Sequence, residues 1–315
     1  MTAVDRGSGL SPEIAAWEAR GAYQRVREHE IFVVDVPAAS VEEQEPLLVL
    51  HGFPTCSFDF HLVVDELARH RRVLLLDMLG YGLSSKPDVA YRIELQADIV
   101  ETVVANLLSE ESGSSAGGTP SIPRLALLTH DMGDTVGGEL LARNLEGKWP
   151  VEISRRVVTN GSIYIDMAHL SDGQSYLLSL PDERLSSKMD PTGAAMTEAL
   201  AATLSPSSEV DRRELDDAWR LIEHNGGDVL LPRLIRYIED RRSKEARYTG
   251  AIETHPSPLA IVWGWDDPIA VVKMASRLHE ARPDAALVVL EGIGHYPMIE
   301  SPQSFSEAVV AGLGG

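Results

Sequence analysis

The chain has 315 residues, of which 44% are hydrophobic, with a mean hydropathy of −0.08 and a formal net charge of −20. This acidity argues against a nucleic-acid partner, because binding phosphates requires a basic surface. The single cysteine, Cys56, excludes an internal disulfide framework and a cysteine-based zinc cluster. No apolar run reaches the roughly 18 residues of a membrane span, and the N-terminal residues lack the apolar stretch of a secretory signal. We therefore expect a globular cytoplasmic protein with no membrane span, and the sequence leaves its oligomeric state open.

Short apolar runs alternate with helical patterns along the chain. An antiparallel start is predicted at residues 24–36, and helical spacing occurs at residues 58–70 and 94–108. Buried strands are predicted at residues 46–50, 72–77, 125–129, 153–159, 259–263 and 286–290. Strands that are apolar on both faces and separated by helices predict an α/β fold, with a mostly parallel sheet covered on both sides.

Two segments interrupt this alternation. Residues 110–123 are small, polar and rich in turn formers, which predicts a surface loop. This loop contains Gly113-Ser-Ser115-Ala-Gly117, which matches Gly-x-Ser-x-Gly but lacks the strand and helix that a nucleophile requires on either side. Residues 162–252 show helical patterns and no clear buried strand, which predicts a helical cap domain. The core domain would then comprise residues 1–161 and 253–315.

Asp131 stands in the segment Leu127-Leu-Thr-His-Asp131-Met-Gly133, between an apolar strand and a helical pattern. This context is typical of the sharp turn that presents a nucleophile above a sheet, and Thr129 and Gly133 occupy positions where bulk would clash. A carboxylate needs no deprotonation to attack carbon, and a helix N-terminus stabilises its ionised form. Attack on an sp³ carbon gives an ester that water must then hydrolyse. The alternative is that Asp131 only caps the helix.

Three further segments follow predicted strands. The turn His51-Gly-Phe53-Pro54 follows residues 46–50, and its Phe53 N–H together with the N–H of Met132 would form an oxyanion hole. The glycine-flanked His295 is a candidate general base. Asp267 would orient it, with Asp266 as a rival. All these segments lie at carboxyl ends of strands, where open α/β sheets place their sites.

These motifs resemble those of the α/β-hydrolase superfamily, on the aspartate-nucleophile branch that contains epoxide hydrolases and haloalkane dehalogenases. The mesoderm-specific transcript family is similar in HGFPTCSFDF, THDMGD, TNGSIY, the RYIEDRR stretch and GHYPMIESP. The resemblance spans residues 45–300 and rests on HGFPT, DMLGYGLSSKP, LLTHDMGD, WGWDDP and GIGHYP. It implies a cap inserted after the fourth parallel strand of the core, Asp131 as nucleophile, Asp267 as acid and His295 as base. Asp267 is preferred because it stands three residues after Gly264, and neither a metal nor an organic cofactor is implied.

The choice of reaction depends on hydrogen-bond donors. Dehalogenases of this branch bind the departing halide with side-chain donors at positions that Phe53 and Met132 occupy here, and neither has such a donor. The loss of one donor costs about 3 kcal/mol, or roughly a hundredfold in rate. Trp219 in the cap is a possible replacement.

Epoxide hydrolases instead protonate the opening oxygen with a pair of cap tyrosines. Tyr237 resembles one of that pair, and Tyr164, Tyr176 and Tyr248 are candidates for the other. Tyr237 could also pack passively at the boundary between cap and core.

The sequence thus predicts a hydrolase that opens epoxides to diols through an ester on Asp131, with a small apolar organic substrate and water as its partners. Haloalkane dehalogenation is one alternative, and a non-catalytic ligand-binding role is another. His51, Tyr164 and Tyr176 are predicted to contact the substrate. Asp134 would either raise the pKa of the nucleophile or face away from it in the first helical turn.

Overall fold

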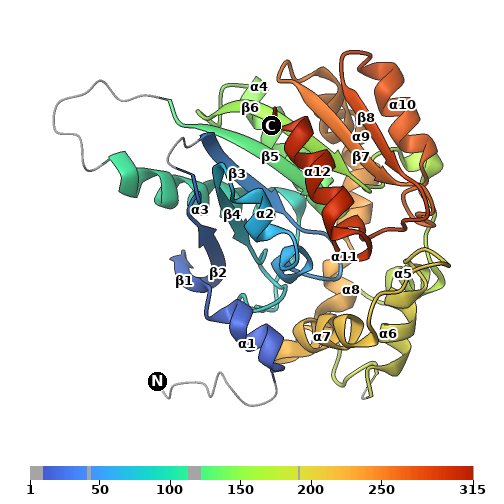
Figure 1. Ribbon diagram of the computed structural model, residues 1–315. Helices are drawn as coiled ribbons and strands as arrows, with labels where there is room; N and C mark the ends of the chain where they lie inside the picture. Colours follow the sequence, from blue (N-terminus) through green and yellow to red (C-terminus); the bar gives the residue numbers. More distant parts are fainter. Residues whose placement is uncertain (1–9, 41–43, 113–121, 191, 315) are drawn as a thin grey trace.

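One eight-stranded sheet organises the computed structural model, which describes residues 10–40, 44–112, 122–190 and 192–314 (Figure 1). The strands are β1 (Gly21–Val26), β2 (His29–Val36), β3 (Gln44–Leu50), β4 (Arg71–Leu76), β5 (Arg124–His130), β6 (Glu152–Thr159), β7 (Leu259–Gly264) and β8 (Ala286–Leu290). Their order across the sheet is β1-β2-β4-β3-β5-β6-β7-β8. Strand β2 runs antiparallel to β1 and β4, and every other neighbouring pair is parallel. The predicted fold class is therefore confirmed.

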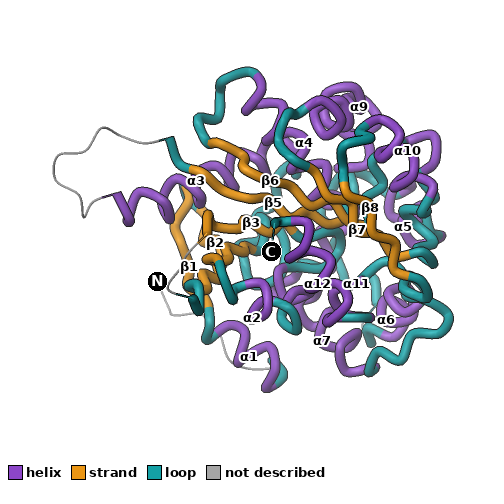
Figure 2. Tube along the Cα trace, turned by 45° about the horizontal axis from the view of Figure 1, so that its top comes forward, coloured by secondary structure: helices purple, strands orange, loops and turns teal. Residues whose placement is uncertain are grey.

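Helices cover both faces of this sheet. The helices of the described residues are α1 (Pro12–Glu18), α2 (Val64–Leu67), α3 (Ile93–Ser112), α4 (Met132–Leu145), α5 (Asp172–Ser179), α6 (Ala194–Ala201), α7 (Arg212–Glu223), α8 (Leu231–Leu234), α9 (Tyr237–Thr254), α10 (Lys273–Ala281), α11 (Pro297–Glu300) and α12 (Pro302–Gly312). Helices α3, α4 and α9 pack side by side on one face, whereas α2 and α12 pack together on the other (Figure 2). None of the described helices is long and apolar enough to cross a membrane.

The predicted helix at residues 58–70 is wrong in length. The structure has a 3₁₀ turn at Ser57–Phe60 and then only the four-residue helix α2. Both the backbone N–H and the hydroxyl of Ser57 donate to Asp77 Oδ1, at 2.9 and 2.5 Å. These tertiary bonds hold the segment against the loop after β4, and local helical spacing does not reveal them.

Between β6 and β7 the described residues form helices and turns without a strand. Helices α5 to α8 gather at one end of the sheet (Figure 1), whereas α9 packs along α4. The predicted loop with its Gly113–Gly117 motif lies largely outside the described residues, since the motif falls within residues 113–121.

The parallel strands bring distant segments to one edge of the sheet. Strands β3, β5, β6, β7 and β8 all point the same way, so the residues that follow them converge. Asp131 follows β5, Asn160 follows β6, Asp267 lies just beyond β7 and His295 just beyond β8.

Candidate active site

Asp131 occupies a strained turn between β5 and α4. Its backbone has φ 50° and ψ −114°, outside the regions that non-glycine residues favour. Such a conformation costs on the order of 1–3 kcal/mol and is common at functional sites. Close packing enforces it: a Cβ on Gly133 would lie 2.4 Å from the Leu50 carbonyl oxygen, and one on Gly52 would lie 2.6 Å from the Asp131 Cβ. The turn therefore requires glycine at both neighbouring positions.

The two carboxylate oxygens of Asp131 have different surroundings. Oδ2 accepts a hydrogen bond of 2.8 Å from the Phe53 backbone N–H. Oδ1 faces His295, with 4.0 Å between it and Nε2. Met132 begins α4, so its N–H belongs to the helical first turn that lacks intrahelical acceptors. One oxygen is thus held at the predicted oxyanion position, and the other is directed toward the candidate base.

Asp267 binds the opposite side of the His295 ring. The His295 Nδ1–H donates to Asp267 Oδ2 at 2.8 Å, whereas Asp266 accepts a hydrogen bond of 2.9 Å from the Ser205 hydroxyl. The structure thereby separates the two rival carboxylates. Burial by itself lowers the pKa of His295, but the charges of Asp267 and Asp131 outweigh it and raise the pKa to about 9.

Asn160 is a site residue that the sequence reasoning missed. Its Nδ2 donates to Asp267 Oδ2 at 2.7 Å and to the Gly294 carbonyl at 3.3 Å, and its Oδ1 accepts from the Gly264 N–H at 3.1 Å. The side chain thus links the loops that carry the acid and the histidine. Its φ of 48° is one that asparagine tolerates better than most residues. In the sequence, Asn160 could have been recognised as an asparagine that precedes a glycine at the end of a predicted strand.

Tyr237 lies at the start of α9 and is 2% exposed. The centroid of its ring is 5.7 Å from the centroid of the Phe53 ring. The Arg241 guanidinium lies 5.3 Å from the centroid of the Tyr237 ring. Burial and the charge of Asp131 raise the pKa of the Tyr237 phenol, whereas Arg241 lowers it through its charge and a hydrogen bond. Nε and Nη1 of Arg241 are buried and have no partner among the described residues. The structure therefore places a hydroxyl and a buried cation near Asp131.

The other candidate tyrosines have different environments. The Tyr164 hydroxyl donates to Glu253 at 2.7 Å, and the Tyr248 hydroxyl donates to Glu94 at 3.4 Å. Tyr176 lines a cavity and is 56% exposed. Of these three, only Tyr176 lies on the cavity wall.

Two expected substrate contacts do not fit the structure. His51 accepts a hydrogen bond from the Met78 N–H at Nε2 (2.9 Å), and its Nδ1–H donates to the Gly52 carbonyl (2.8 Å). Burial lowers its pKa. Both ring nitrogens are therefore used to join two loops, and neither His51 nor Tyr164 lines the cavity. Trp219 does not line it either, because its indole packs against the backbone of Gly193.

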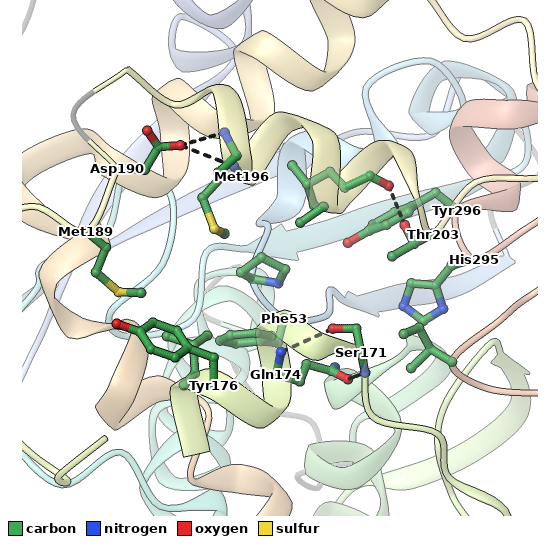
Figure 3. Close-up of a pocket in the computed structure, with 17 residues that line it drawn as sticks. Phe53, Ser171, Gln174, Tyr176, Met189, Asp190, Met196, Thr203, His295 and Tyr296 are labelled. Atoms are coloured by element: carbon green, nitrogen blue, oxygen red, sulfur yellow. Dashed lines mark hydrogen bonds between the residues drawn. The ribbon is translucent and has the colours of Figure 1, made fainter. Parts of the chain in front are cut away.

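A cavity of about 280 Å³ opens beside His295 and Phe53 (Figure 3). Its wall is mainly apolar, and it is lined by Phe53, Pro54, Ser171, Gly173, Gln174, Tyr176, Leu177, Met189, Asp190, Ala195, Met196, Ala199, Leu200, Thr203, Ile269, His295 and Tyr296. Asp131 is in contact with two of these lining residues, Phe53 and His295. Helices α5 and α6 supply much of the opposite wall. This arrangement suits a small apolar molecule.

Asp134 lies in the first turn of α4 and is buried. Its Oδ1 accepts from the Thr129 hydroxyl, and its Oδ2 has no partner among the described residues. Burial, with the charge of Asp131, raises the pKa of Asp134 well above its usual range. A Cβ on Gly161 would overlap its Oδ2. Burial and the charge of Asp131 therefore favour the protonated form of Asp134.

Taken together, an α/β sheet whose strand-to-helix turn holds Asp131 beside His295, with Asp267 on the other side of that ring, has the arrangement of a hydrolase site. Comparison with known proteins agrees. The family model described as "Alpha/beta hydrolase family" matches residues 47–308, and the chain belongs to this family. No group of histidine, cysteine and carboxylate side chains suited to a metal ion occurs among the described residues.

Two curated relatives match nearly the whole chain. "Putative hydrolase LipZ" of Mycobacterium tuberculosis is 34% identical, over 96% of this chain and 98% of that protein. Mesoderm-specific transcript protein of Mus musculus is 30% identical, over 95% of this chain and 87% of that protein. Among solved structures, an enol-lactonase from Burkholderia xenovorans has a TM-score of 0.69 at 19% identity, covering 93% of this chain and all of that one. At that identity the likeness concerns the fold alone.

Proposed function

We propose that this hydrolase uses Asp131 as its nucleophile and opens epoxides to diols. The observation that carries the proposal is the asymmetric setting of the Asp131 carboxylate. One oxygen accepts the Phe53 N–H, and the other lies 4.0 Å from His295 Nε2. No serine occupies the turn, so a serine esterase mechanism lacks its nucleophile at this position.

In the first step, Asp131 Oδ1 attacks an epoxide carbon and the carbon–oxygen bond of the ring breaks. Oδ2 stays on the Phe53 N–H and becomes the carbonyl oxygen of the ester. Tyr237 donates a hydrogen bond to the epoxide oxygen as negative charge develops there. Arg241 beside the phenol favours that donation, because a nearby cation makes the hydroxyl more acidic.

In the second step, the ester no longer carries the Asp131 charge that helps to raise the His295 pKa, and the neutral imidazole removes a proton from water, which attacks the Asp131 ester carbonyl. The Phe53 and Met132 N–H groups stabilise the negative charge on Oδ2. Asp267 keeps the imidazole oriented and stabilises its charged form. The diol leaves with Oδ1, so the carboxylate regains one oxygen from water.

Haloalkane dehalogenation has weaker support. Phe53 and Met132 offer no side-chain donor for a halide, and Trp219 packs away from the cavity. A non-catalytic binding role is disfavoured because Asp131, His295 and Asp267 are assembled in one chain of contacts.

The test is the intact mass of the His295→Gln variant after exposure to a pool of epoxides and haloalkanes. Without its base the enzyme should stall as the ester, so an added mass equal to a whole epoxide supports the proposal. An adduct lighter by one hydrogen halide would instead indicate dehalogenation. Peptide mapping should place the adduct on Asp131, and Asp131→Ala should form none. If Asp131→Ala turned over epoxides at near the wild-type rate, the mechanism would be wrong.

A further inference from the structure

The loop that carries His295 is in contact with the helical region between β6 and β7. The contacting segment, residues 203–205, follows α6. The backbone N–H of His295 donates to the Thr203 carbonyl at 3.0 Å. A Cβ on Gly294 would lie 2.5 Å from the Ser205 nitrogen and 2.7 Å from the Thr203 carbonyl oxygen, so this close approach requires glycine. The candidate base is therefore attached to this region as well as to the sheet.

The Glu300 carboxylate joins the same two segments. Its Oε2 accepts a hydrogen bond of 2.8 Å from the Ser205 N–H. Its Oε1 accepts the Gly294 N–H at 3.0 Å and the Tyr296 N–H at 3.4 Å. All three donors are backbone groups, and two of them belong to the neighbours of His295 in the chain. A single side chain thus holds the backbone on both sides of the candidate base and links it to Ser205.

The carbonyl group of His295 is held from the sheet instead. The His130 ring nitrogen Nε2 lies 2.8 Å from this carbonyl oxygen, and because a carbonyl only accepts hydrogen bonds, Nε2–H is the donor. His130 is the last residue of β5 and directly precedes Asp131. The sheet therefore fixes one side of the His295 backbone, whereas the other side depends on Thr203 and, through its neighbours, on Glu300.

The segment that holds His295 also lines the cavity. Leu200 and Thr203 lie on the cavity wall, and the Thr203 hydroxyl donates to the Leu200 carbonyl at 2.7 Å. Thr203, His295 and Tyr296 lie together at one side of the cavity (Figure 3). A substrate in this cavity would therefore meet the same residue whose carbonyl accepts the His295 N–H.

We propose that Glu300 is a positioning residue that holds His295 against residues 203–205 and thereby sets the rate of ester hydrolysis. This inference rests on the proposed ester mechanism. Glu300 does not line the cavity, and it acts through the backbone around His295. Asp131, which attacks in the first step, is held by the Phe53 N–H, so ester formation does not depend on Glu300.

The size of the effect follows from the geometry of the second step. His295 Nε2 lies 4.0 Å from Asp131 Oδ1, and the base must hold water against the ester carbonyl formed there. Displacement of a catalytic group by about 1 Å can lower a rate on the order of a hundredfold. Glu300→Gln has one oxygen for donors on both sides, so its NH₂ group must face the N–H of either Ser205 or Gly294. We therefore expect ester hydrolysis to slow by about 10- to 100-fold.

The test follows both steps by rapid quenching and intact-mass measurement, with the epoxide that alkylates Asp131 in the His295→Gln protein. In Glu300→Gln the ester should form at near the wild-type rate and then accumulate. Gly294→Ala disturbs the same contact from the histidine side and should act in the same direction. Glu291→Gln changes an exposed carboxylate in the same loop and should leave both steps unchanged. Ester hydrolysis at the wild-type rate in Glu300→Gln, or equal slowing of both steps, would overturn the proposal while the epoxide chemistry stood.

A proton NMR signal tests the positioning without any substrate. The His295 Nδ1–H that donates to Asp267 should give a far-downfield resonance, assigned by its loss in His295→Gln. Glu300→Gln should shift or broaden this resonance, and Glu291→Gln should leave it in place. An unchanged resonance in Glu300→Gln would overturn the positioning role. If no epoxide formed an adduct on the His295→Gln protein, the proposed function would fail, and the resonance would still decide whether Glu300 positions His295.

Discussion

Asp267→Asn should block the second half of the reaction because every partner of the Asp267 carboxylate is a hydrogen-bond donor. Oδ1 accepts the N–H groups of Ile269 and Ala270, at 2.8 and 2.9 Å. Oδ2 accepts Asn160 Nδ2 at 2.7 Å and His295 Nδ1 at 2.8 Å. An asparagine has one oxygen, so its NH₂ group must face two donors in either orientation.

Either orientation has a cost. If the amide NH₂ faces His295, the imidazole must carry its proton on Nε2 and can no longer accept one from water. If it faces Ile269 and Ala270, two buried N–H groups lose their acceptor, at about 1–3 kcal/mol each. Loss of the correct tautomer in a comparable triad lowers the rate about 10⁴-fold, equivalent to ~5.5 kcal/mol. We expect ester hydrolysis to fall by about 10³- to 10⁴-fold.

Rapid quenching followed by intact-mass measurement resolves the two steps. In Asp267→Asn the ester on Asp131 should form within about tenfold of the wild-type rate and then accumulate, because Asp267 does not contact the attacking oxygen. Asp266→Asn is the matched control: the same change one residue earlier affects a carboxylate bonded to Ser205, and both steps should stay near wild type. Hydrolysis of the ester on Asp267→Asn at the wild-type rate, or equal slowing of both steps, would refute this role of Asp267.

Three further predictions concern residues around the nucleophile. Arg241→Met should slow ester formation about tenfold or more and leave ester hydrolysis unchanged in the same quench assay, since Arg241 acts on the Tyr237 phenol; equal slowing of both steps would contradict this. Asp134 has a raised pKa in the folded state, so it stabilises the fold at low pH, and this stability is lost as pH rises from about 4 toward the raised pKa, by up to about 1.4 kcal/mol per pH unit. Urea unfolding should therefore show a shallower decline of stability above about pH 4 for Asp134→Asn, and an unchanged slope would argue against a raised pKa of this carboxyl. Gly161→Ala should destabilise the protein by about 1–3 kcal/mol in the same unfolding assay, because its methyl group would overlap Asp134, and a neutral effect would show that the site can relax.

The positions of the parallel strands could largely be predicted from local sequence patterns. Apolar runs bounded by turns predicted the parallel strands, because a strand covered on both faces must be apolar on both sides. Strand ends then indicated which polar residues converge, since parallel strands deliver their carboxyl ends to one edge. Asp131 and His295 stood out for this reason, and the structure brings them within 4.0 Å.

Side-chain partnerships were decided by tertiary structure. Asp266 and Asp267 are neighbours in the chain, yet only Asp267 faces His295, and its partner Asn160 is 107 residues away. Tyr164 was a candidate for the second cap tyrosine, but its hydroxyl donates a hydrogen bond to Glu253, which is 89 residues away in the sequence.

The protonation state of buried carboxyl groups was likewise decided by tertiary structure. The sequence determined which carboxyl groups exist and which strands or helices they adjoin. Only the packing around Asp134 decided that its protonated form is favoured, because burial withdraws the water that would stabilise the charged form. Desolvation and long-range hydrogen bonds depend on residues that the fold brings together, so no local pattern encodes them.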